Sequence, residues 1–580
     1  MDIDGKLANK EAEAALSAEG FQPSADGKWA GKLQIDGIEV VSEITIPEGF
    51  PSSVPVVRVD RKSLPRRIPH MERDGKLCLV PSAGVLIDAS RPKDIIRQIL
   101  SKARTLLHEG LNGSNESDLI KEFLGYWNPT CLAIIESVCM PWGPSREIHL
   151  LHFRFSDSPK EESILAADDL VTGQAWLSRL GWQFVRSETA WFHVLTSTFL
   201  PPEFDLRFLT RDFVKAVQAA SSDVDCKKFQ DWLVSNGLPR RMICCMPTLG
   251  NNGSILFGAK LVRATGDLKK EAIKGFRKHS MPVLREFCCS LRQPLNPIRV
   301  ERFDTEYLLQ RGGGTMDLRS RTVVVVGCGA IGSQLVEKIA SLGVGTIRLI
   351  DNDNLKAENV YRHALGVEYF RQNKAKAMQS ALGKRFPNLI VESEGERVQT
   401  VLKDRPDFLL KADLICIAVG DETLELWLNE VIKGQIPRIH AWVEPLGIGG
   451  HVLATGCTQG DGCYRCLFRE DSELGLNNSS AFASAGQAFG QSLAGCSGTY
   501  TPFGSWDADR TASEAARLAA RILTGRERQS VLVSWFGDPE EFTAHFRLSP
   551  RAGMFKPGEV KTVYSFRNEG CACKRWSNQK

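Results

Sequence analysis

A glycine-rich turn after an apolar segment is the part of this sequence whose spacing most clearly suggests chemistry. Four valines, residues 323–326, are followed by Gly327, Gly329 and Gly332 in the spacing G-x-G-x-x-G. The valine run predicts a strand that is buried on both faces. The first two glycines allow a tight turn and a close approach to a phosphate, and the third lets the next helix pack closely on the strand. The turn predicts a nucleotide-binding site, for which a dinucleotide-dependent oxidoreductase is the commonest interpretation.

Charged residues downstream of the turn favour a triphosphate instead. A second apolar strand is predicted to end at Asp351, whose carboxylate can accept hydrogen bonds from a ribose, and Asp353 follows it. Arg362 and Lys376 supply fixed positive charge, which suits a triphosphate better than the pyrophosphate of a dinucleotide. A further apolar strand is predicted to end near Asp421, which can hold Mg2+ beside the phosphates. We therefore expect ATP with Mg2+ and not NAD.

This ordered set of residues resembles the adenylation domain of ubiquitin-activating enzymes and of their bacterial ThiF and MoeB relatives. The resemblance covers residues 302–580 and implies a Rossmann-like ThiF adenylation domain, with Arg362, Lys376 and Asp421 as catalytic residues. Two positions depart from the family pattern, because His363 stands where Gln is common and Asn373 where Gly is common. The nucleotide-binding residues that the resemblance implies are Gly327, Gly329, Gly332, Asp351, Asp353, Asn359, Arg362, Lys376 and Asp421.

A cysteine near the N-terminus lies in a second suggestive context. Cys78 follows a glycine-containing turn in the run Gly-Lys-Leu-Cys-Leu. The preceding sequence predicts a helix over residues 6–19 and antiparallel strands over residues 31–35 and 38–46. The sequence after it predicts a helix over residues 91–108. Cys78 is therefore expected on a turn between a small sheet and a helix.

This order of elements is similar to a ubiquitin-conjugating enzyme over residues 1–115. In that family the cysteine carries the activated protein as a thioester, which implies the same role for Cys78. His70 occupies the position of a family asparagine that is credited with organising the loop and stabilising the oxyanion. An imidazole N–H can donate a hydrogen bond there, so His70 is a candidate catalytic residue. The alternative for Cys78 is a small hydrophobic residue buried on a strand.

The middle of the chain is predicted to be a linker. Residues 116–296 alternate strand-like and helix-like runs and contain no catalytic constellation, which is typical of an α/β linker domain. The predicted fold class is thus an α/β multidomain protein. Its parts are an N-terminal α+β ubiquitin-conjugating-like domain over residues 1–115, the linker domain, and the adenylation domain over residues 297–580.

Two close pairs of cysteines lie far apart in the chain. Cys463 and Cys466 form a C-x-x-C motif, which alone suits either a redox pair or half of a metal site. Cys571 and Cys573 form a shorter C-x-C near the end of the chain. Four thiolates in two close pairs suit tetrahedral zinc, and relatives of the adenylation domain often carry such a zinc on two C-x-x-C pairs. We expect a structural Zn2+, with free thiols as the alternative.

A further cysteine, Cys496, lies among small residues in the run 494–504, ahead of an alanine-rich helix expected over residues 512–523. A helix N-terminus lowers the pKa of a thiol from about 8.5, and small neighbours leave the sulfur open to attack. The segment resembles that of atypical activating enzymes, in which the catalytic cysteine shortly precedes Thr-Pro and a helix. Cys496 is therefore a candidate nucleophile, and the alternative is an idle cysteine in a glycine-rich loop.

Together these parts predict one chemical sequence. A protein C-terminal carboxylate attacks the α-phosphate of ATP, Cys496 takes the acyl group as a thioester, and Cys78 receives it before a lysine amine forms an amide. An activating domain behind a conjugating domain is similar to the fusion proteins of bacterial CBASS anti-phage operons. That resemblance implies a homodimer that conjugates the C-terminus of a cGAS-like nucleotidyltransferase to cellular targets.

Two other functions remain open. A sulfur-carrier adenylyltransferase would use Cys463 or another thiol for sulfur transfer, and its N-terminal region would be only a binding module. A non-catalytic scaffold with a degenerate nucleotide fold would have no use for Arg362, Lys376 and Asp421.

Composition narrows the class of protein. The 580 residues carry a net charge of +4 with 24% charged residues, so no nucleic-acid partner is implied. The N-terminus lacks a signal-peptide pattern, and no apolar run is long enough to cross a bilayer. The 16 cysteines are scattered, which suits free thiols in a reducing cytoplasm. We therefore expect a cytoplasmic enzyme without a membrane partner.

Overall fold

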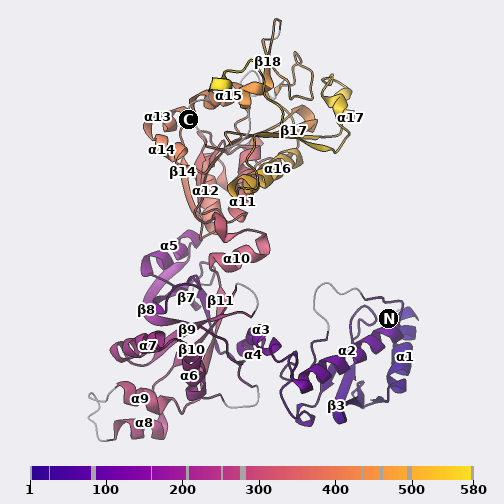
Figure 1. Cartoon of the computed structure of the whole chain (residues 1–580), viewed down its shortest axis with the longest axis vertical. Helices are drawn as coiled ribbons and strands as arrows, with labels where there is room; N and C mark the ends of the chain where they lie inside the picture. The colour runs from indigo at the N-terminus through magenta and orange to yellow at the C-terminus, as the bar shows by residue number, and fades with distance from the viewer. Residues whose placement is uncertain are drawn as a thin grey trace. The chain divides into compact units, whose positions relative to one another are not determined.

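The computed structural model divides into two compact units (Figure 1). The first unit contains most of residues 1–302, and the second contains residues 303–580 with the short segments 155–157 and 174–184. Within the described part of the chain, no helix combines the length and apolar character that a membrane span requires. The described residues are 3–24, 26–79, 87–158, 160–203, 208–249, 253–274, 283–432, 436–457, 462–473, 475–492 and 499–575.

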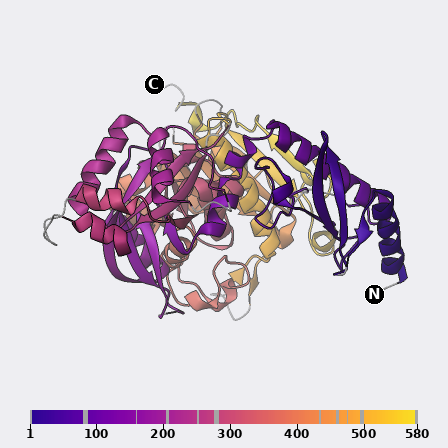
Figure 2. The same ribbon diagram turned by 90° about the horizontal axis from the view of Figure 1, so that it is seen from below.

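The N-terminal part of the first unit is a four-stranded antiparallel sheet with helices beside it (Figure 2). Leu33 and Val40 face each other on neighbouring strands and are buried with the apolar faces of both helices. The predicted order of helix, strands and helix is confirmed. The elements are α1 (Ile3–Ala18), β1 (Gln22–Pro23), β2 (Trp29–Ile35), β3 (Ile38–Thr45), β4 (Val56–Val59) and α2 (Pro92–Asn112).

The rest of the first unit is built around a closed barrel with the strand order β10-β11-β5-β7-β6-β8-β9. Its strands are β5 (Ala133–Ser137), β6 (Arg146–Arg154), β7 (Glu162–Ala167), β8 (Gln183–Val194), β9 (Arg240–Pro247), β10 (Ser254–Leu261) and β11 (Asn296–Arg302). One buried cluster, which includes Leu150, Phe192 and Ile243, draws residues from every strand. The barrel interior is therefore packed side chains.

Along the chain, helices precede the first barrel strand and connect later ones. They are α3 (Asp118–Lys121), α4 (Phe123–Trp127), α5 (Leu170–Leu180), α6 (Thr210–Ala219), α7 (Asp223–Asn236), α8 (Gly266–Ile273) and α9 (Val283–Ser290). The sequence predicted mixed α/β structure here but not the closure of the strands into a barrel. The last strand, β11, begins where the linker domain was predicted to end.

The second unit is organised by an eight-stranded sheet with the order β14-β13-β12-β15-β16-β17-β22-β23. The first five strands are parallel and the last three are antiparallel. The chain order reverses between β12 and β15, and in such sheets ligands bind beyond the carboxyl ends of the strands at that point. The strands are β12 (Thr322–Val326), β13 (Thr346–Ile350), β14 (Ile390–Glu394), β15 (Leu414–Ile417), β16 (Arg438–Val443), β17 (Gly449–Thr455), β22 (Val531–Phe536) and β23 (Val560–Val563).

Helices cover both faces of this sheet. Val323 and Val325 of β12 pack with α11 (Ala330–Ser341), α12 (Lys374–Arg385) and α16 (Ser505–Leu523). Val324 and Val326 point the other way and pack with α13 (Val398–Asp404), α14 (Pro406–Leu410) and α15 (Glu422–Val431). The valine run is therefore buried on both faces, as predicted. The smaller elements are α10 (Thr305–Gly312), β18 (Phe468–Asp471), β19 (Gly475–Asn478), β20 (Gln491–Ser492), β21 (Thr499–Tyr500) and α17 (Glu540–Thr543).

Helix α16 begins at Ser505, earlier than the predicted start at residue 512. The Asp507 carboxylate accepts a hydrogen bond from the Gly504 N–H at 2.8 Å, which stabilises the first turn. Ala508 and Thr511 also lie on the buried face of the helix. The predicted start lay too far along the chain because the prediction relied on the alanine-rich part of the helix and not on its polar first turn.

Candidate nucleotide and thioester sites

The glycine turn after β12 has the geometry of a phosphate-binding loop. Gly327 has a φ of +88°, and a Cβ atom there would lie 2.6 Å from the Ala418 carbonyl oxygen at the end of β15. A Cβ atom on Gly332 would lie 1.8 Å from the Gly327 carbonyl oxygen. At Gly329, which precedes the first residue of α11, a Cβ atom would meet nothing within 4 Å. The turn thus packs tightly against the protein and leaves space at the helix N-terminus, where backbone N–H groups can bind a phosphate.

The Asp351 carboxylate ties this turn to the end of β13. One oxygen accepts the Cys328 N–H at 2.6 Å, and the other accepts the Asp353 N–H at 2.8 Å. Burial raises the pKa of the Asp351 carboxyl. Each carboxylate oxygen has a second lone pair, so Asp351 can still accept a bond from a ribose as predicted.

Two basic side chains line a small cavity at the turn. The cavity lies between Gly329, Ala330, Asn359, Arg362, His363 and Lys374. The Lys374 side chain is buried, with 8% of the residue exposed, and its Nζ lies 3.2 Å from an Asp353 oxygen. Asn359 accepts the Lys356 N–H at 3.0 Å, which closes the turn before Arg362. The structure therefore places Asn359, Arg362 and Lys374 at the cavity and Asp353 beside Lys374, and the nucleotide-binding roles of the predicted residues stay predictions.

Lys376, which was predicted for this role, is exposed and does not line the cavity. Both lysines lie in the first turn of α12, and positions two residues apart are rotated by about 200° around a helix. Lys374 therefore lines the cavity, and the catalytic role predicted for the exposed Lys376 stays a prediction. The Asn373 side chain caps the helix by accepting the Lys376 N–H at 3.1 Å.

His363 holds the cavity wall to the glycine turn. Its Nε2 lies 2.7 Å from the Cys328 carbonyl oxygen, and its Nδ1 lies 3.0 Å from the Leu365 N–H. This pattern assigns a neutral ring that donates at Nε2 and accepts at Nδ1. Burial lowers the pKa of His363 to about 4, which agrees with the neutral form. The departure from the family pattern at this position therefore has a structural role.

Asp421 follows β15 and begins α15. Its carboxylate accepts the Leu424 N–H at 3.1 Å and so caps the helix. The residue is exposed at the carboxyl end of the strand that neighbours β12. This position suits the predicted magnesium ligand, because the side chain has a free oxygen and lies on the ligand-binding edge of the sheet.

Cys78 is exposed at the end of a turn that belongs to the first unit. Its N–H donates to the His70 carbonyl oxygen at 2.7 Å, and its Sγ lies 3.8 Å from an oxygen of Glu72. Partial burial of the sulfur, together with the carboxylates of Glu72 and Glu122, raises the pKa of the Cys78 thiol. The residue is accessible, which a buried structural cysteine would not be.

His70 adopts a left-handed backbone conformation, with a φ of +58°. Its Nδ1 lies 2.7 Å from an oxygen of Glu122, and its Nε2 lies 3.1 Å from an oxygen of Asp118. Both ring nitrogens are thus engaged by carboxylates from α3 and the residue after it. The predicted donation to an oxyanion would require one of these bonds to break, and that role stays a prediction.

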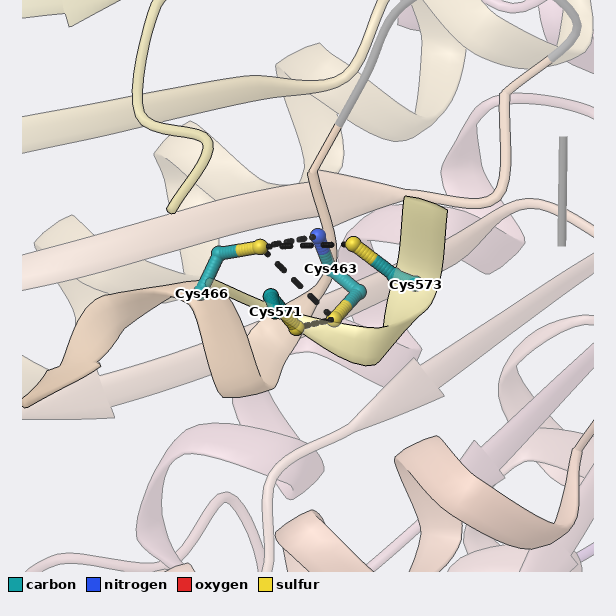
Figure 3. Close-up of side chains that lie close together, drawn as sticks. All are labelled: Cys463, Cys466, Cys571 and Cys573. Atoms are coloured by element: carbon teal, nitrogen blue, oxygen red, sulfur yellow. Dashed lines mark hydrogen bonds between the residues drawn. The ribbon is translucent and has the colours of Figure 1, made fainter. Parts of the chain in front are cut away.

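The four cysteines of the two pairs meet in one cluster (Figure 3). The Sγ–Sγ distances are 3.9 Å for Cys463–Cys466, 3.7 Å for Cys463–Cys571 and 3.5 Å for Cys466–Cys573. A tetrahedral site with Zn–S bonds of about 2.3 Å places its sulfurs about 3.8 Å apart. The Asn429 side chain also donates to the Cys463 sulfur at 3.6 Å. These residues fit a zinc ion that ties the end of the chain to the segment after β17.

Comparison with known proteins identifies the two ends of the chain. A model of prokaryotic E2 family B matches residues 6–131, and a model of the ThiF family matches residues 305–534. The chain is an E1/E2 fusion. The predicted fold class, an E2-like domain followed by a ThiF adenylation domain, is confirmed.

Curated relatives share most of the fusion's length. It is 26% identical to the ATP-dependent ubiquitin transferase-like protein Cap2 of Pseudomonas aeruginosa (strain BWHPSA011 / Pa011), over 80% of this chain and 81% of the relative. It is 23% identical to Cap2 of Escherichia coli (strain TW11681), over 77% of this chain and 79% of the relative. The crystal structure of E. coli MccB with MccA-N7isoASN is similar over 46% of this chain and 69% of that chain, with 19% identity and a TM-score of 0.33. The fusion is a ubiquitin-like activating and conjugating enzyme.

The candidate nucleophile of the ThiF domain, Cys496, lies outside the described residues. The described segments on either side of it are β20 and β21, which pair with each other through Gln491 and Tyr500. The predicted thioester on Cys496 therefore stays a prediction that chemical trapping must test.

Removing the cysteine cluster tests the zinc of the fusion. We expect elemental analysis to find about one Zn2+ per chain. Cys571→Ala should remove that metal and lower the melting temperature of the ThiF domain, because the end of the chain is no longer held to the cluster. Cys457→Ala, at a partly buried cysteine outside the cluster, is the control and should retain the metal. A wild-type protein that holds no metal and melts identically with and without a chelator would contradict the assignment.

Proposed function

We propose that the fusion activates the C-terminal carboxylate of a protein with ATP and joins it to an amine through two thioesters. The acyl group passes from an adenylate to Cys496 with release of AMP, then to Cys78, and then to a lysine of the target. The observation that carries the proposal is the cavity at the switch point of the sheet, where the glycine turn meets Arg362 and Lys374. An exposed Cys78 in an E2-like domain supplies the second half of the relay.

The cavity supports the adenylation step. Attack of a carboxylate on the α-phosphorus releases pyrophosphate, and negative charge builds up on the phosphate oxygens during the reaction. Arg362, Lys374 and the N-terminus of α11 place positive charge beside the space at Gly329. A Mg2+ ion held by Asp421 would add Lewis-acid stabilisation of the same charge.

The E2-like domain supports the transfer steps. A thioester carrier must meet first the donor thioester and then the acceptor amine, so its sulfur has to be accessible, and Cys78 is exposed. Transthiolation forms the bond from the Cys78 sulfur to the acyl carbon and breaks the bond from the Cys496 sulfur. The amine then replaces the Cys78 sulfur and loses a proton. Carrying both thiols in one chain raises the effective concentration of each near the other.

The proposed partners follow the resemblance to CBASS fusion proteins. We propose a cGAS-like nucleotidyltransferase as the protein whose C-terminus is activated, a lysine-bearing protein as the target, and a homodimer as the assembled state. The likeness to Cap2 of Pseudomonas aeruginosa over 80% of the chain supports the ubiquitin transferase-like activity, and the substrate is proposed from the resemblance alone.

Sulfur-carrier activation is the second candidate function. The adenylyltransferase and sulfurtransferase MOCS3 of Danio rerio is 25% identical to this chain over 36% of the chain. That function needs an accessible sulfur-transfer thiol. Cys463 is only 3% exposed and lies within the four-cysteine cluster. Its position therefore favours the conjugation relay over sulfur transfer through Cys463.

The relay is tested with the purified chain, ATP and a purified cGAS-like nucleotidyltransferase. Exchange of radiolabelled pyrophosphate into ATP should require the C-terminal residues of the substrate, and a substrate without them is the control. Intact mass spectrometry should then detect enzyme that carries one substrate and loses it on treatment with a thiol. Absence of exchange with the intact substrate would overturn the proposed substrate. Exchange without any thioester would show that the chain only adenylates its substrate, and it would overturn the proposed relay.

A further inference from the structure

The guanidinium group of Arg362 lies against two aromatic rings. Its Cζ atom is 5.1 Å from the centroid of the Phe503 ring and 5.9 Å from the centroid of the Tyr500 ring. Both distances are within the range of about 6 Å at which a ring face attracts a cation. Arg362 also lines the nucleotide cavity, so one side chain contacts the cavity and both rings.

The Phe503 ring is held in place by the backbone on either side of it. The Pro502 carbonyl oxygen accepts the Leu446 N–H at 2.6 Å, and the Gly504 N–H donates to Asp507 at 2.8 Å. Leu446 itself adopts a φ of +55° in the turn between β16 and β17. These bonds join the segment to the turn after β16 and to α16. They hold the backbone of Phe503 in place, so that its ring can pack against the Arg362 side chain.

The Tyr500 ring is anchored independently. It lies on β21, which pairs with β20, and its hydroxyl donates to the Gln491 side chain at 3.2 Å. The two rings therefore belong to one stretch, residues 499–504. Hydrogen bonds hold this stretch to β20, to Leu446 and to Asp507. This stretch directly follows the run that contains Cys496 in the sequence.

Aromatic rings hold a cation without neutralising it. Among the residues that the structure describes, Arg362 has no carboxylate within ion-pair distance, whereas Lys374 is paired with Asp353. A carboxylate partner at this position would compete with a phosphate for the guanidinium. The rings reduce the number of conformations open to a long side chain while leaving its charge and its N–H donors available.

We propose that Phe503 and Tyr500 position the Arg362 guanidinium for the phosphates of ATP. They are positioning residues and do not themselves contact the reacting atoms. The inference rests on the proposed adenylation function, and it identifies the stretch that follows Cys496 as part of the nucleotide site. Changes in this stretch therefore alter ATP affinity and not only thioester formation.

Equilibrium binding of ATP to the full chain tests this directly, because it needs no turnover. Phe503→Leu removes the ring face but keeps an apolar side chain, and we expect it to weaken ATP binding about fivefold. Phe503→Tyr keeps the ring and should bind ATP as the wild type does. In pyrophosphate exchange, Phe503→Leu should raise the KM for ATP and leave the KM for the protein substrate unchanged.

A double-mutant cycle separates positioning from a general structural effect. If Phe503 acts through Arg362, then Phe503→Leu should cause no further loss of ATP affinity in an Arg362→Ala background. Equal losses in both backgrounds would overturn the inference, as would wild-type affinity in Phe503→Leu or equal losses in Phe503→Leu and Phe503→Tyr. A wild-type chain that binds ATP but shows no pyrophosphate exchange would instead count against the proposed adenylation function. The comparison of ATP affinity between Phe503→Leu and the wild type would still decide the role of the rings.

Discussion

Asp421→Asn is expected to abolish adenylation, with a loss of pyrophosphate exchange of at least about a hundredfold. The physical reason is that Asn keeps the shape of the side chain but removes the negative charge that would bind Mg2+ beside the phosphates. Without adenylate neither Cys496 nor Cys78 can be acylated, so both thioesters should disappear together. The measurement is exchange of labelled pyrophosphate, followed by intact mass of the enzyme.

The choice of Asn separates chemistry from folding. Asp421 also caps α15 by accepting the Leu424 N–H, and Asp421→Ala would lose that cap at a cost of about 1 kcal/mol. An Asn side chain can still accept this bond, so the melting temperature should be unchanged. Glu422→Gln, which removes the neighbouring exposed carboxylate, is the matched control and should retain exchange. Wild-type exchange in Asp421→Asn would remove Asp421 from the magnesium site.

Cys496→Ala and Cys78→Ala are expected to stop the relay at different steps. Cys496→Ala should retain adenylation and block every thioester, because the first acyl acceptor is missing. Cys78→Ala should accumulate substrate on Cys496 and yield no conjugate, because the amine then lacks its acyl donor. Pyrophosphate exchange, intact mass before and after thiol treatment, and gel analysis of conjugates distinguish the three states.

Exposed thiols elsewhere provide the control for this pair. Cys288 is exposed on α9 of the first unit and has no proposed role, so Cys288→Ala should conjugate as the wild type does. Conjugation at the wild-type rate by Cys78→Ala would exclude Cys78 from the mechanism. A thioester that persists in Cys496→Ala would show that another sulfur accepts the acyl group first.

Much of the nucleotide site was predictable because its determinants are local. The valine run specifies a strand buried on both faces, and a Cβ atom on Gly332 has no room because of Gly327 in the same turn. The contact that excludes a Cβ atom at Gly327 is instead made by Ala418, which lies far away in the sequence. The start of helix α16 was predicted at residue 512 and not at Ser505, because the prediction followed the alanine-rich run and missed the polar first turn that Asp507 caps at Gly504.

Contacts between distant segments were not predictable from spacing. His70 meets two carboxylates that lie about fifty residues downstream, and no periodic pattern in the sequence signals that approach. The preference for Lys374 over Lys376 at the cavity depends on how α12 is rotated against the sheet. Closure of the seven strands into a barrel likewise depends on which strand edges pair.

The sequence by itself determined the E2-like and ThiF-type domains, the glycine turn and the two cysteine pairs, because residue types and short spacings specify local backbone geometry and donor atoms. The tertiary structure confirmed the predicted meeting of the two pairs in one cluster, and it alone decided which lysine lines the cavity and that Arg362 packs against Phe503 and Tyr500. These are contacts between side chains more than one hundred residues apart or choices between neighbouring positions. They depend on how whole elements pack, and packing is a property of the folded chain.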